Sequence, residues 1–371
     1  MSTPGALKVL HVTETLPGGI ATYLRELVLL HKDDPAIAEI RVLAPRDQLS
    51  HLKELPSGML RGYERTGRNL RSLWSLSVAL RAQVAELGPC VIHLHSSFAG
   101  TIGRLLRFCL PPDVRIVYCP HGWAFSRDGG WITRLTYIWI ERLLASCAHA
   151  WIAISQHELD AASAVGIRSN HAHMIYNGVS DTQEVPVEPL PEMNPGYINL
   201  LFVGRHDRQK GLDIVLSVMP KLAQQKIRLY VVGAGVIDDM QQTQNVGNIT
   251  WLGWRSGTDL IACYRACSAV IMPSRWEGMG LVAAEAMREG KPVVASQRGA
   301  LPEVVGDGGI LFDPENAEAL LALLLRLDSA QLLALGLKAR ARYLQCFQSE
   351  RMGQEVMALY QGLKMQEHRT E

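Results

Sequence analysis

The chain has 371 residues, of which 48% are hydrophobic and 20% are charged, and its formal net charge is +1. This length exceeds one ordinary hydrophobic core, so two domains of under about 200 residues each are expected. The balanced charge excludes a strongly basic nucleic-acid binder, and no apolar run reaches the ~18 residues that a membrane span needs.

Short β-branched runs alternate with helical stretches through the first half of the chain. Strands are predicted at residues 8–12, 41–43, 91–95, 115–119 and 150–154. These runs are continuously apolar, as strands buried on both faces of a sheet should be, and the helices between them predict parallel βαβ units. Residues 1–180 are therefore predicted to form a Rossmann-like domain.

Proline and acidic residues interrupt this rhythm over 181–196, which is typical of a linker. The rhythm then restarts with strands predicted at residues 198–204, 228–233, 249–252, 269–272 and 292–295. Residues 197–348 predict a second Rossmann-like domain, and the last segment, 349–371, carries a helix that could pack back on the first domain. The predicted fold is α/β, with two parallel sheets that face each other across a cleft. Ligands of such sheets lie beyond the carboxyl ends of the strands, so the binding site is expected there.

Two carboxylates in the second half, Glu277 and Glu285, flank a turn that leads into an apolar helix start. An ionised carboxylate accepts two hydroxyl hydrogen bonds at once, as a bound polyol requires. The backbone N–H groups of Met279, Gly280 and Leu281 would lie at a helix N-terminus, which suits a phosphate. Hydroxyls on the acids and phosphate on the amides together predict a nucleotide-sugar site.

A glycine-bounded loop, Gly204 to Gly211, follows one predicted strand and precedes a helix. Arg205 and Lys210 would therefore lie at the carboxyl edge of the sheet, where an arginine fork and a lysine point charge could clamp a diphosphate. The alternative is a solvated loop with ordinary surface charges. The chain contains no Asp-x-Asp pair to hold a divalent ion, which agrees with protein cations, and no metal, on the diphosphate.

Glycine and histidine residues follow strands of the first half. Gly18 and Gly19 lie between a strand and a helix, where a backbone could approach a ligand closely or form a plain tight turn. His121 could reach into a cleft as a hydrogen-bond donor or be satisfied in the core. His93 and His95 share one strand face, and His95, nearer the carboxyl edge, is the better site candidate.

Two further segments of the first half have open interpretations. A basic run near Trp74 comprises Arg61, Arg65, Arg68 and Arg71. It could lie on an anionic membrane surface or form a solvated helix face. The aromatic-rich segment 131–140 could line an acceptor groove or belong to the core.

The motifs of the second half share one pattern: Gly204-Arg205 with Lys210-Gly211, Pro273 to Gly280, Glu285-Ala286-Met287, Gly290 to Ala295 and Gly299 to Val305. They resemble the retaining GT-B glycosyltransferases of family GT4, of the type that assembles bacterial polysaccharide, exopolysaccharide or O-antigen. The first half is similar more loosely, through Gly18-Gly19, His121-Gly122 and Asn177-Gly178-Val179.

The resemblance implies roles for individual residues. The catalytic group would be Arg205, Lys210, Glu277 and His121. The residues that bind the donor would be Gly18, Gly19, Gly204, Gly233, Trp254, Arg255, Met279, Gly280, Leu281 and Glu285. Within these sets the two cations would hold the diphosphate, Glu277 the transferred sugar and Glu285 the ribose.

The sequence thus predicts a retaining, metal-independent glycosyltransferase that needs no cofactor besides its nucleotide-sugar substrate. No acidic residue stands at Arg255 or Ser256 to read guanine, which favours a UDP-sugar over a GDP-sugar. The expected acceptor is a lipid-linked glycan. Alternatives are a GDP-mannose-dependent mannosyltransferase of the same family, a sugar-nucleotide epimerase of the same fold, and a sugar-binding subunit with a decayed site.

A cytoplasmic location is expected, with possible contact at the cytoplasmic face of the membrane. The N-terminus lacks the basic start and apolar block of a signal peptide. The seven cysteines show no paired spacing, which favours a reducing compartment.

Overall fold

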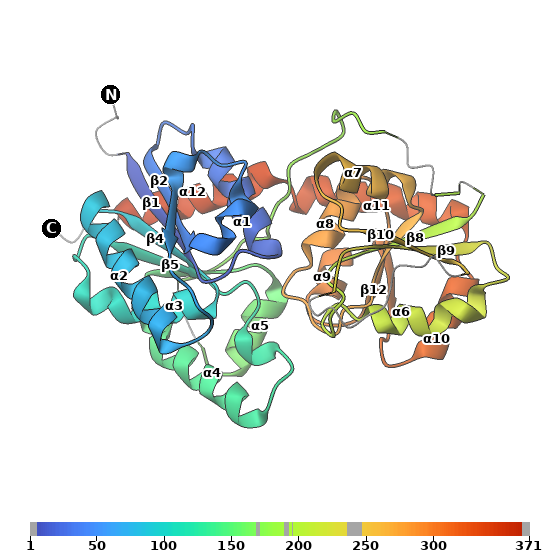
Figure 1. Ribbon diagram of the computed structural model, residues 1–371, viewed down its shortest axis with the longest axis horizontal. Coiled ribbons are helices and arrows are strands. Elements are labelled where there is room, and N and C mark those ends of the chain that lie inside the picture. The colour runs from blue at the N-terminus through green and yellow to red at the C-terminus, as the bar shows by residue number, and fades with distance from the viewer. Residues whose placement is uncertain (1–5, 168–170, 189–192, 195, 236–246, 366–371) are drawn as a thin grey trace. The chain divides into compact units, whose positions relative to one another are not determined.

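The computed structural model describes residues 6–167, 171–188, 193–194, 196–235 and 247–365. The chain divides into two compact units. Unit 1 comprises Met1–Gly178 and Ser349–Glu371, and unit 2 comprises Val179–Gln348. Each unit is built on its own sheet with helices on both faces (Figure 1).

Unit 1 contains a parallel sheet with the strand order β3-β2-β1-β4-β5-β6-β7. Its strands are β1 (Leu7–Thr13), β2 (Ile37–Pro45), β3 (Leu60–Tyr63), β4 (Val91–His95), β5 (Arg115–Cys119), β6 (Ala150–Ala153) and β7 (Ala172–Met174). The central strands were predicted, whereas β3 and β7 were missed. Both missed strands are short edge strands with partly exposed residues, so they lack the continuous apolar run that identifies a central strand.

The helices of unit 1 are α1 (Gly19–His31), α2 (Leu70–Leu87), α3 (Ser97–Leu105), α4 (Trp131–Leu144), α5 (Gln156–Ala164) and α12 (Ser349–Met365). Short 3-10 turns are η1 (Arg46–Leu52), η2 (Ser57–Met59), η3 (Leu106–Cys109), η4 (Ala124–Ser126) and η5 (Ala145–Cys147). Helix α1 packs against α12, and α3 packs against both α2 and α4. The final helix therefore belongs to unit 1, although unit 2 precedes it in the chain (Figure 1).

Hydrogen bonds from two buried histidines help to attach α12 to the rest of unit 1. His31 Nε2–H of α1 donates to the Gly353 carbonyl oxygen at 2.9 Å, and His93 Nδ1 of β4 lies 2.6 Å from the Tyr360 hydroxyl. Both histidines are buried, so each contact replaces hydrogen bonds to water that burial removes.

Unit 2 contains a second parallel sheet with the strand order β10-β9-β8-β11-β12-β13. Its strands are β8 (Ile198–Val203), β9 (Ile227–Val232), β10 (Ile249–Gly253), β11 (Ala269–Met272), β12 (Val293–Ser296) and β13 (Gly309–Phe312). Its helices are α6 (Leu212–Val218), η6 (Met219–Leu222), α7 (Gly257–Ala266), α8 (Leu281–Arg288), α9 (Leu301–Val305), α10 (Ala317–Leu325) and α11 (Ser329–Cys346). Two parallel α/β units confirm the predicted fold class; only the edge strand β13 was missed.

The segment interpreted as a linker, 181–196, falls within unit 2. Its described residues are anchored: Asp181 Oδ2 accepts from Arg340 at 2.6 Å, and the Thr182 hydroxyl donates to Glu289. Arg340 holds the pKa of Asp181 below its usual value despite partial burial. Residues 189–192 and 195 of the predicted linker lie outside the described residues.

The basic run of the first half does not form one helix face. Arg61 lies in β3, and Arg71 lies in the first turn of α2. Arg65 and Arg68 donate to one carboxylate oxygen of Glu14, at 3.0 and 3.1 Å. Glu14 is buried, so these two cations neutralise an internal charge.

The aromatic-rich segment 131–140 forms most of α4, and the interpretation as core is wrong for much of it. Trp131 is 72% exposed and Trp139 is 66% exposed. Helix α4 rests on α3 through its other face, where Glu141 and Leu144 are buried. Among the described residues of unit 1, the aromatic side of α4 keeps large apolar side chains exposed.

Among the described residues, no single helix is long and apolar enough to cross a membrane. Helices α10 and α11 pass the length and composition test only together, and they are bent by 104°.

Candidate active site

Two loops of unit 2 meet where the connections of its sheet change direction. The chain runs from β8 to β9 and β10 on one side, and through β11, β12 and β13 on the other. The loops after β8 and β11 therefore lie side by side at the carboxyl ends, where open α/β sheets bind ligands. Gly211 adopts a left-handed φ of 66°, and a Cβ there would lie 2.1 Å from the Pro273 carbonyl oxygen, so the loops touch.

Lys210 and Glu277 form an ion pair between these loops. Lys210 Nζ lies 2.5 Å from Glu277 Oε1, which also accepts from the Ser274 hydroxyl at 2.9 Å. Glu277 is 8% exposed, so its carboxylate is held in place by partners instead of by water. The structure thus brings together two predicted site residues that lie 67 positions apart in the sequence.

Arg205 lies on the same loop as Lys210. Its Nη2 contacts Asp207 Oδ2 at 2.9 Å and Gln209 Oε1 at 3.1 Å, and its side chain remains 43% exposed. Asp207 Oδ1 also accepts from the Lys210 backbone N–H at 3.0 Å. Asp207 therefore shapes the loop that carries both cations, a role that the sequence analysis missed.

Gly204 and Gly233 bring the ends of β8 and β9 together. A Cβ on Gly233 would lie 1.9 Å from the Gly204 carbonyl oxygen, so only glycine fits there. At the next strand end, Trp254 is 69% exposed, and Arg255 Nε donates to the Leu252 carbonyl oxygen at 3.1 Å. The predicted nucleobase region is thus an accessible edge with an exposed indole ring.

The N-terminus of α8 follows Gly280, which has a left-handed φ of 81°. The first backbone N–H groups of a helix, here from Leu281, have no partner within the helix and attract anions. The Met279 side chain is buried at 2% exposure, so only its backbone can face a ligand. Glu285 Oε2 accepts from the buried Tyr264 hydroxyl at 2.6 Å, which fixes this carboxylate one turn into the helix.

The glycines predicted in unit 1 begin α1. Gly18 is the N-cap residue with a φ of 95°, and Gly19 is the first helical residue. No atom lies within 4 Å of a Cβ built on Gly18, so the backbone conformation, and not crowding, requires glycine there.

His121 follows β5 in a strained loop with a φ of 51°. The buried carboxylate of Glu158 holds this loop: it accepts from the Gly122 N–H through one oxygen and from the Ile154 N–H, at 2.9 Å, through the other. Trp123 Nε1–H donates to the Glu158 carbonyl oxygen at 2.9 Å. Glu158 was not predicted from the sequence, although Ser155 and Glu158 have the spacing of a capping box, which marks a helix start.

His121 is neither wholly in the core nor free. It is half-buried, and its Nε2 lies 2.9 Å from Nδ1 of His95, which is fully buried. Burial lowers the pKa of His121 to about 3, so its imidazole is neutral at physiological pH. His95 thus contacts His121, but it is fully buried instead of exposed at the edge of the sheet.

One trio of described residues, His11, His93 and His95, has potential metal-binding atoms within 4.8 Å of one another. All three are fully buried, and the group includes no carboxylate to balance a divalent charge. Hydrogen bonds to His121 and Tyr360 already occupy nitrogens of His95 and His93. The trio is better suited to hydrogen bonding than to a metal ion.

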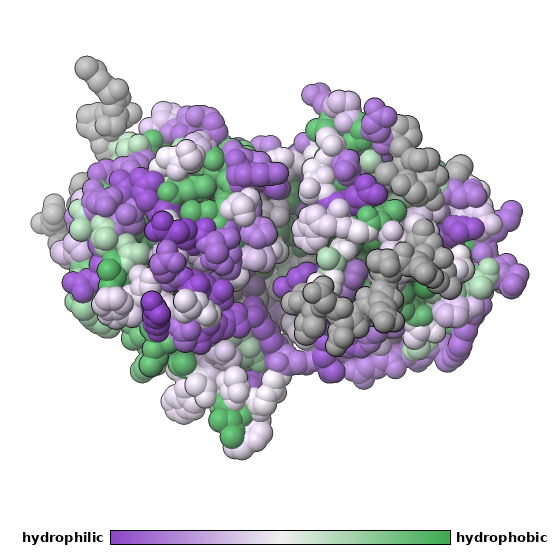
Figure 2. Space-filling model, viewed as in Figure 1, coloured by the Kyte–Doolittle hydropathy of each residue, from purple (hydrophilic) through white to green (hydrophobic). Residues whose placement is uncertain are grey.

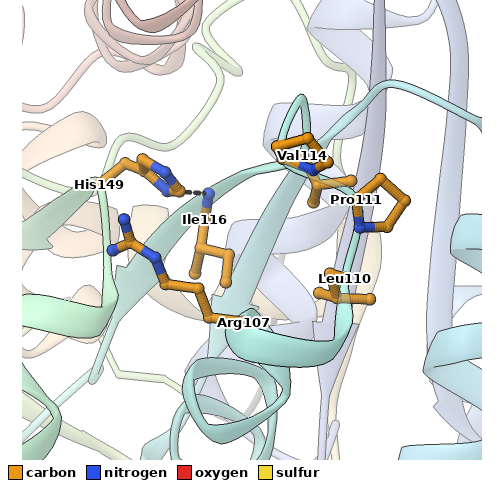
Figure 3. A pocket seen from close by; sticks show the side chains of 7 residues that line it. Arg107, Leu110, Pro111, Val114, Ile116 and His149 are labelled. Atoms are coloured by element: carbon orange, nitrogen blue, oxygen red, sulfur yellow. Dashed lines mark hydrogen bonds between the residues drawn. The ribbon is translucent and has the colours of Figure 1, made fainter.

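A small pocket of about 320 Å³ lies in unit 1 beside β5 (Figure 3). It is lined by Arg107, Leu110, Pro111, Pro112, Val114, Ile116 and His149. His149 Nδ1 accepts from the Ile116 N–H at 2.9 Å, and Arg107 Nη1 donates to the Ser146 carbonyl oxygen at 2.9 Å, so both polar side chains of the lining already have partners. The pocket lies at the amino end of β5, opposite to His121, and none of the predicted site residues lines it.

Comparisons with known proteins agree with this arrangement. The profile described as "Glycosyltransferase Family 4" matches residues 17–183, and the profile described as "Glycosyl transferases group 1" matches residues 198–329. An "Uncharacterized 41.2 kDa protein in cps region" of Klebsiella pneumoniae is 34% identical over 328 residues, which cover 86% of this chain and 89% of the relative.

Two solved structures share the fold. Sucrose-phosphate synthase from Thermosynechococcus elongatus matches with a TM-score of 0.77 at 22% identity, over 96% of this chain and 99% of the other. HepE of Anabaena in complex with UDP matches with a TM-score of 0.76 at 21% identity, over 95% and 99%. The chain therefore belongs to glycosyltransferase family 4 and has the GT-B fold.

Proposed function

We propose that this glycosyltransferase transfers a sugar, with retention of configuration and without a metal ion, from a UDP-sugar to a lipid-linked glycan during polysaccharide assembly. The observation that carries the proposal is the Lys210–Glu277 pair at the switch point of unit 2, with Arg205 on the same loop. The name of the Klebsiella relative supports the polysaccharide context, and the UDP complex of HepE supports the donor.

The proposed chemistry uses charge placed in advance. Breaking the bond between sugar and diphosphate leaves negative charge on the departing phosphate. Lys210 and Arg205 are fixed by Glu277 and Asp207, so they stabilise that charge without rearranging during the reaction. The acceptor hydroxyl attacks from the face that the phosphate leaves, and the departing phosphate takes its proton.

The acids serve binding in this scheme. Glu277 has one oxygen on Lys210 and Ser274, and its second oxygen can accept a hydroxyl of the transferred sugar. Glu285, fixed by Tyr264, can accept the ribose hydroxyls. Phosphate oxygens would meet the N–H groups at the start of α8.

Donor choice is tested by calorimetric titration of the full chain with UDP and with GDP. We expect UDP to bind at least about tenfold tighter, and Glu285→Gln to weaken UDP by roughly tenfold, since one hydrogen bond to a charged group contributes about 1.5 kcal/mol. Glu318→Gln, an exposed residue of α10, is the control. Tighter binding of GDP would favour the mannosyltransferase alternative, and no binding of either would contradict a nucleotide-sugar enzyme.

The exposed side of α4 supports a membrane-proximal acceptor. Trp131, Ile132, Leu135, Trp139 and Leu143 are between 45% and 75% exposed. Arg134 and Arg142 accompany them, and the Arg142 guanidinium lies 5.6 Å from the Trp139 ring. Apolar side chains reach the surface around α4 in the space-filling view (Figure 2). Indole rings with arginines are suited to an interface of anionic lipid.

We therefore expect the protein to float with vesicles that contain anionic phosphatidylglycerol, and less with pure phosphatidylcholine. Replacing both Trp131 and Trp139 with serine should lower the vesicle-bound fraction at least about tenfold, since each buried apolar side chain contributes about 1.5 kcal/mol. Leu333→Ser with Leu337→Ser is a matched control on α11, because these leucines are 72% and 71% exposed. Equal losses in both double variants would contradict a membrane role for α4.

A further inference from the structure

Three histidines of unit 1 form a hydrogen-bonded chain that runs from the buried interior to the edge of the sheet. His11 Nδ1 lies 3.1 Å from His95 Nε2, and His95 Nδ1 lies 2.9 Å from His121 Nε2. His11 and His95 are 0% exposed, whereas His121 is half-buried. The chain therefore has one closed end, at His11, and one open end, at His121.

The fold itself aligns these imidazoles. His11 of β1 is opposite His93 of β4. His95 lies two positions after His93 on the same strand and is opposite Cys119 of β5. The histidines thus point to the same face of the sheet, which α1 and α12 cover. The Tyr23 ring of α1 packs edge-on against His121, with the ring centroids 4.7 Å apart.

All three imidazoles are neutral. Burial lowers the pKa of His11 and of His121 to about 3, and it lowers the pKa of His95 well below its usual value. A neutral imidazole has one N–H donor and one bare nitrogen acceptor. Both bonds of the chain must therefore run in the same direction, because His95 donates through one nitrogen and accepts through the other.

Only two states satisfy this condition. In the outward state His11 donates to His95, His95 donates to His121, and His121 carries its proton on Nδ1. In the inward state every bond reverses, and His11 must carry its proton on Nε2. Among the described residues, His11 Nε2 has no hydrogen-bond partner.

The closed end decides between the two states. The inward state buries an unpaired N–H donor at His11, whereas the outward state leaves only a bare acceptor nitrogen. Orphaned buried N–H groups are the rarer and less tolerated case. We propose that His11 and His95 are positioning residues that hold His121 in its Nδ1–H tautomer, so that His121 presents a hydrogen-bond donor at the open edge of unit 1.

The tautomer of His121 does not depend on the proposed function; only the substrate that His121 would bind does. A donor at His121 can bind an oxygen of the sugar or phosphate, whereas the opposite tautomer would place a bare nitrogen there and repel it. The bond to His95 uses His121 Nε2. Within the described residues His121 Nδ1 makes no hydrogen bond, so this nitrogen is available to a substrate.

The test measures the tautomer directly in the ligand-free full chain. Selective ¹⁵N-histidine labelling and NMR correlation of ring nitrogens with ring protons distinguish protonated Nδ1 from protonated Nε2, and the His121→Asn spectrum assigns the signals. We expect His121 to be protonated on Nδ1. A His121 protonated on Nε2 overturns the proposal, whatever the activity of the protein.

Two variants at one position then separate the tautomer from packing. His95→Asn keeps an N–H donor near the position of Nδ1, whereas His95→Phe keeps the ring but removes the bond. We expect His95→Phe to mix the tautomers of His121 and to lower kcat by about 10- to 100-fold, as loss of an orienting partner does elsewhere, with little change in the donor KM. His95→Asn should retain the Nδ1–H tautomer and most of kcat.

Equal losses of kcat in the two variants, or a loss confined to KM, would show a packing role and overturn the proposal. Thermal unfolding of both variants reports whether they fold. Absence of sugar transfer by a wild-type protein that shows the Nδ1–H tautomer would count against the proposed function and would leave the histidine chain standing.

Discussion

Replacing Lys210 with alanine is expected to lower kcat for sugar transfer on the order of 10²–10³-fold, as removal of one preorganised donor to a developing anion does in other enzymes. The reason is geometric. Lys210 is held 2.5 Å from Glu277 before any substrate arrives, so its charge needs no reorganisation when the phosphate departs. The measurement is steady-state transfer with a saturating donor.

A control must separate lost charge from lost folding, because alanine leaves the buried Glu277 carboxylate without its ammonium. Lys210→Gln keeps a hydrogen-bond donor for Glu277 and removes the charge, so it should lose nearly as much activity with less change in thermal unfolding. Lys221→Ala removes a lysine from an exposed pair with Glu318 and should leave kcat unchanged. If Lys210→Gln retained full activity, the proposed role of the charge would be wrong.

The second large effect is on stability. Arg104→Met is expected to destabilise unit 1 by about 3–5 kcal/mol, because it leaves a buried carboxylate without its cation. Arg104 Nη2 lies 2.7 Å from Glu141 Oε2, and both side chains are 2% exposed. The Tyr118 hydroxyl donates to the other oxygen of Glu141 at 2.9 Å. The pair ties α3 to α4, so its loss should loosen the helix that carries the exposed tryptophans.

Chemical denaturation measures this effect through the free energy of unfolding. Arg46→Met is the matched control, because Arg46 pairs with Glu64 at the surface with side chains 68% and 74% exposed, and such pairs contribute about 0–1 kcal/mol. Adding Glu141→Leu and Tyr118→Phe to Arg104→Met should recover much of the loss, since the buried carboxylate and the hydroxyl that donates to it are then removed together. Equal effects of Arg104→Met and Arg46→Met would contradict the account.

The sequence predicted the central strands because their burial on both faces leaves a continuous apolar run. It did not predict β3, β7 or β13, whose residues are partly exposed, so the same physical signal is absent. It also predicted that the loops with Lys210 and Glu277 lie at one edge of the sheet, because parallel strands place their carboxyl ends along one edge.

Contacts between residues that are distant in the chain could not be predicted from the sequence. The sequence predicted that Lys210 and Glu277 lie on loops at one edge of the sheet. It did not predict that the two side chains form an ion pair. Arg65 and Arg68 contact Glu14, which lies 51 and 54 positions earlier in the sequence. Two arginines of a run that was interpreted as a membrane-binding or solvated helix face therefore neutralise an internal charge. Apolar content made 131–140 look like core, because composition does not reveal whether a helix face has a partner.

The most direct test of the account is transfer of label from radiolabelled UDP-sugars to lipid-linked glycan extracted from membranes. The account predicts labelled lipid-linked product and released UDP with at least one donor, and loss of both with Lys210→Gln. A changed sugar nucleotide formed without acceptor would indicate an epimerase instead. Absence of transfer from every UDP-sugar and GDP-sugar would contradict the proposed glycosyl transfer. So would a Glu277→Ala variant that transfers sugar at the wild-type rate.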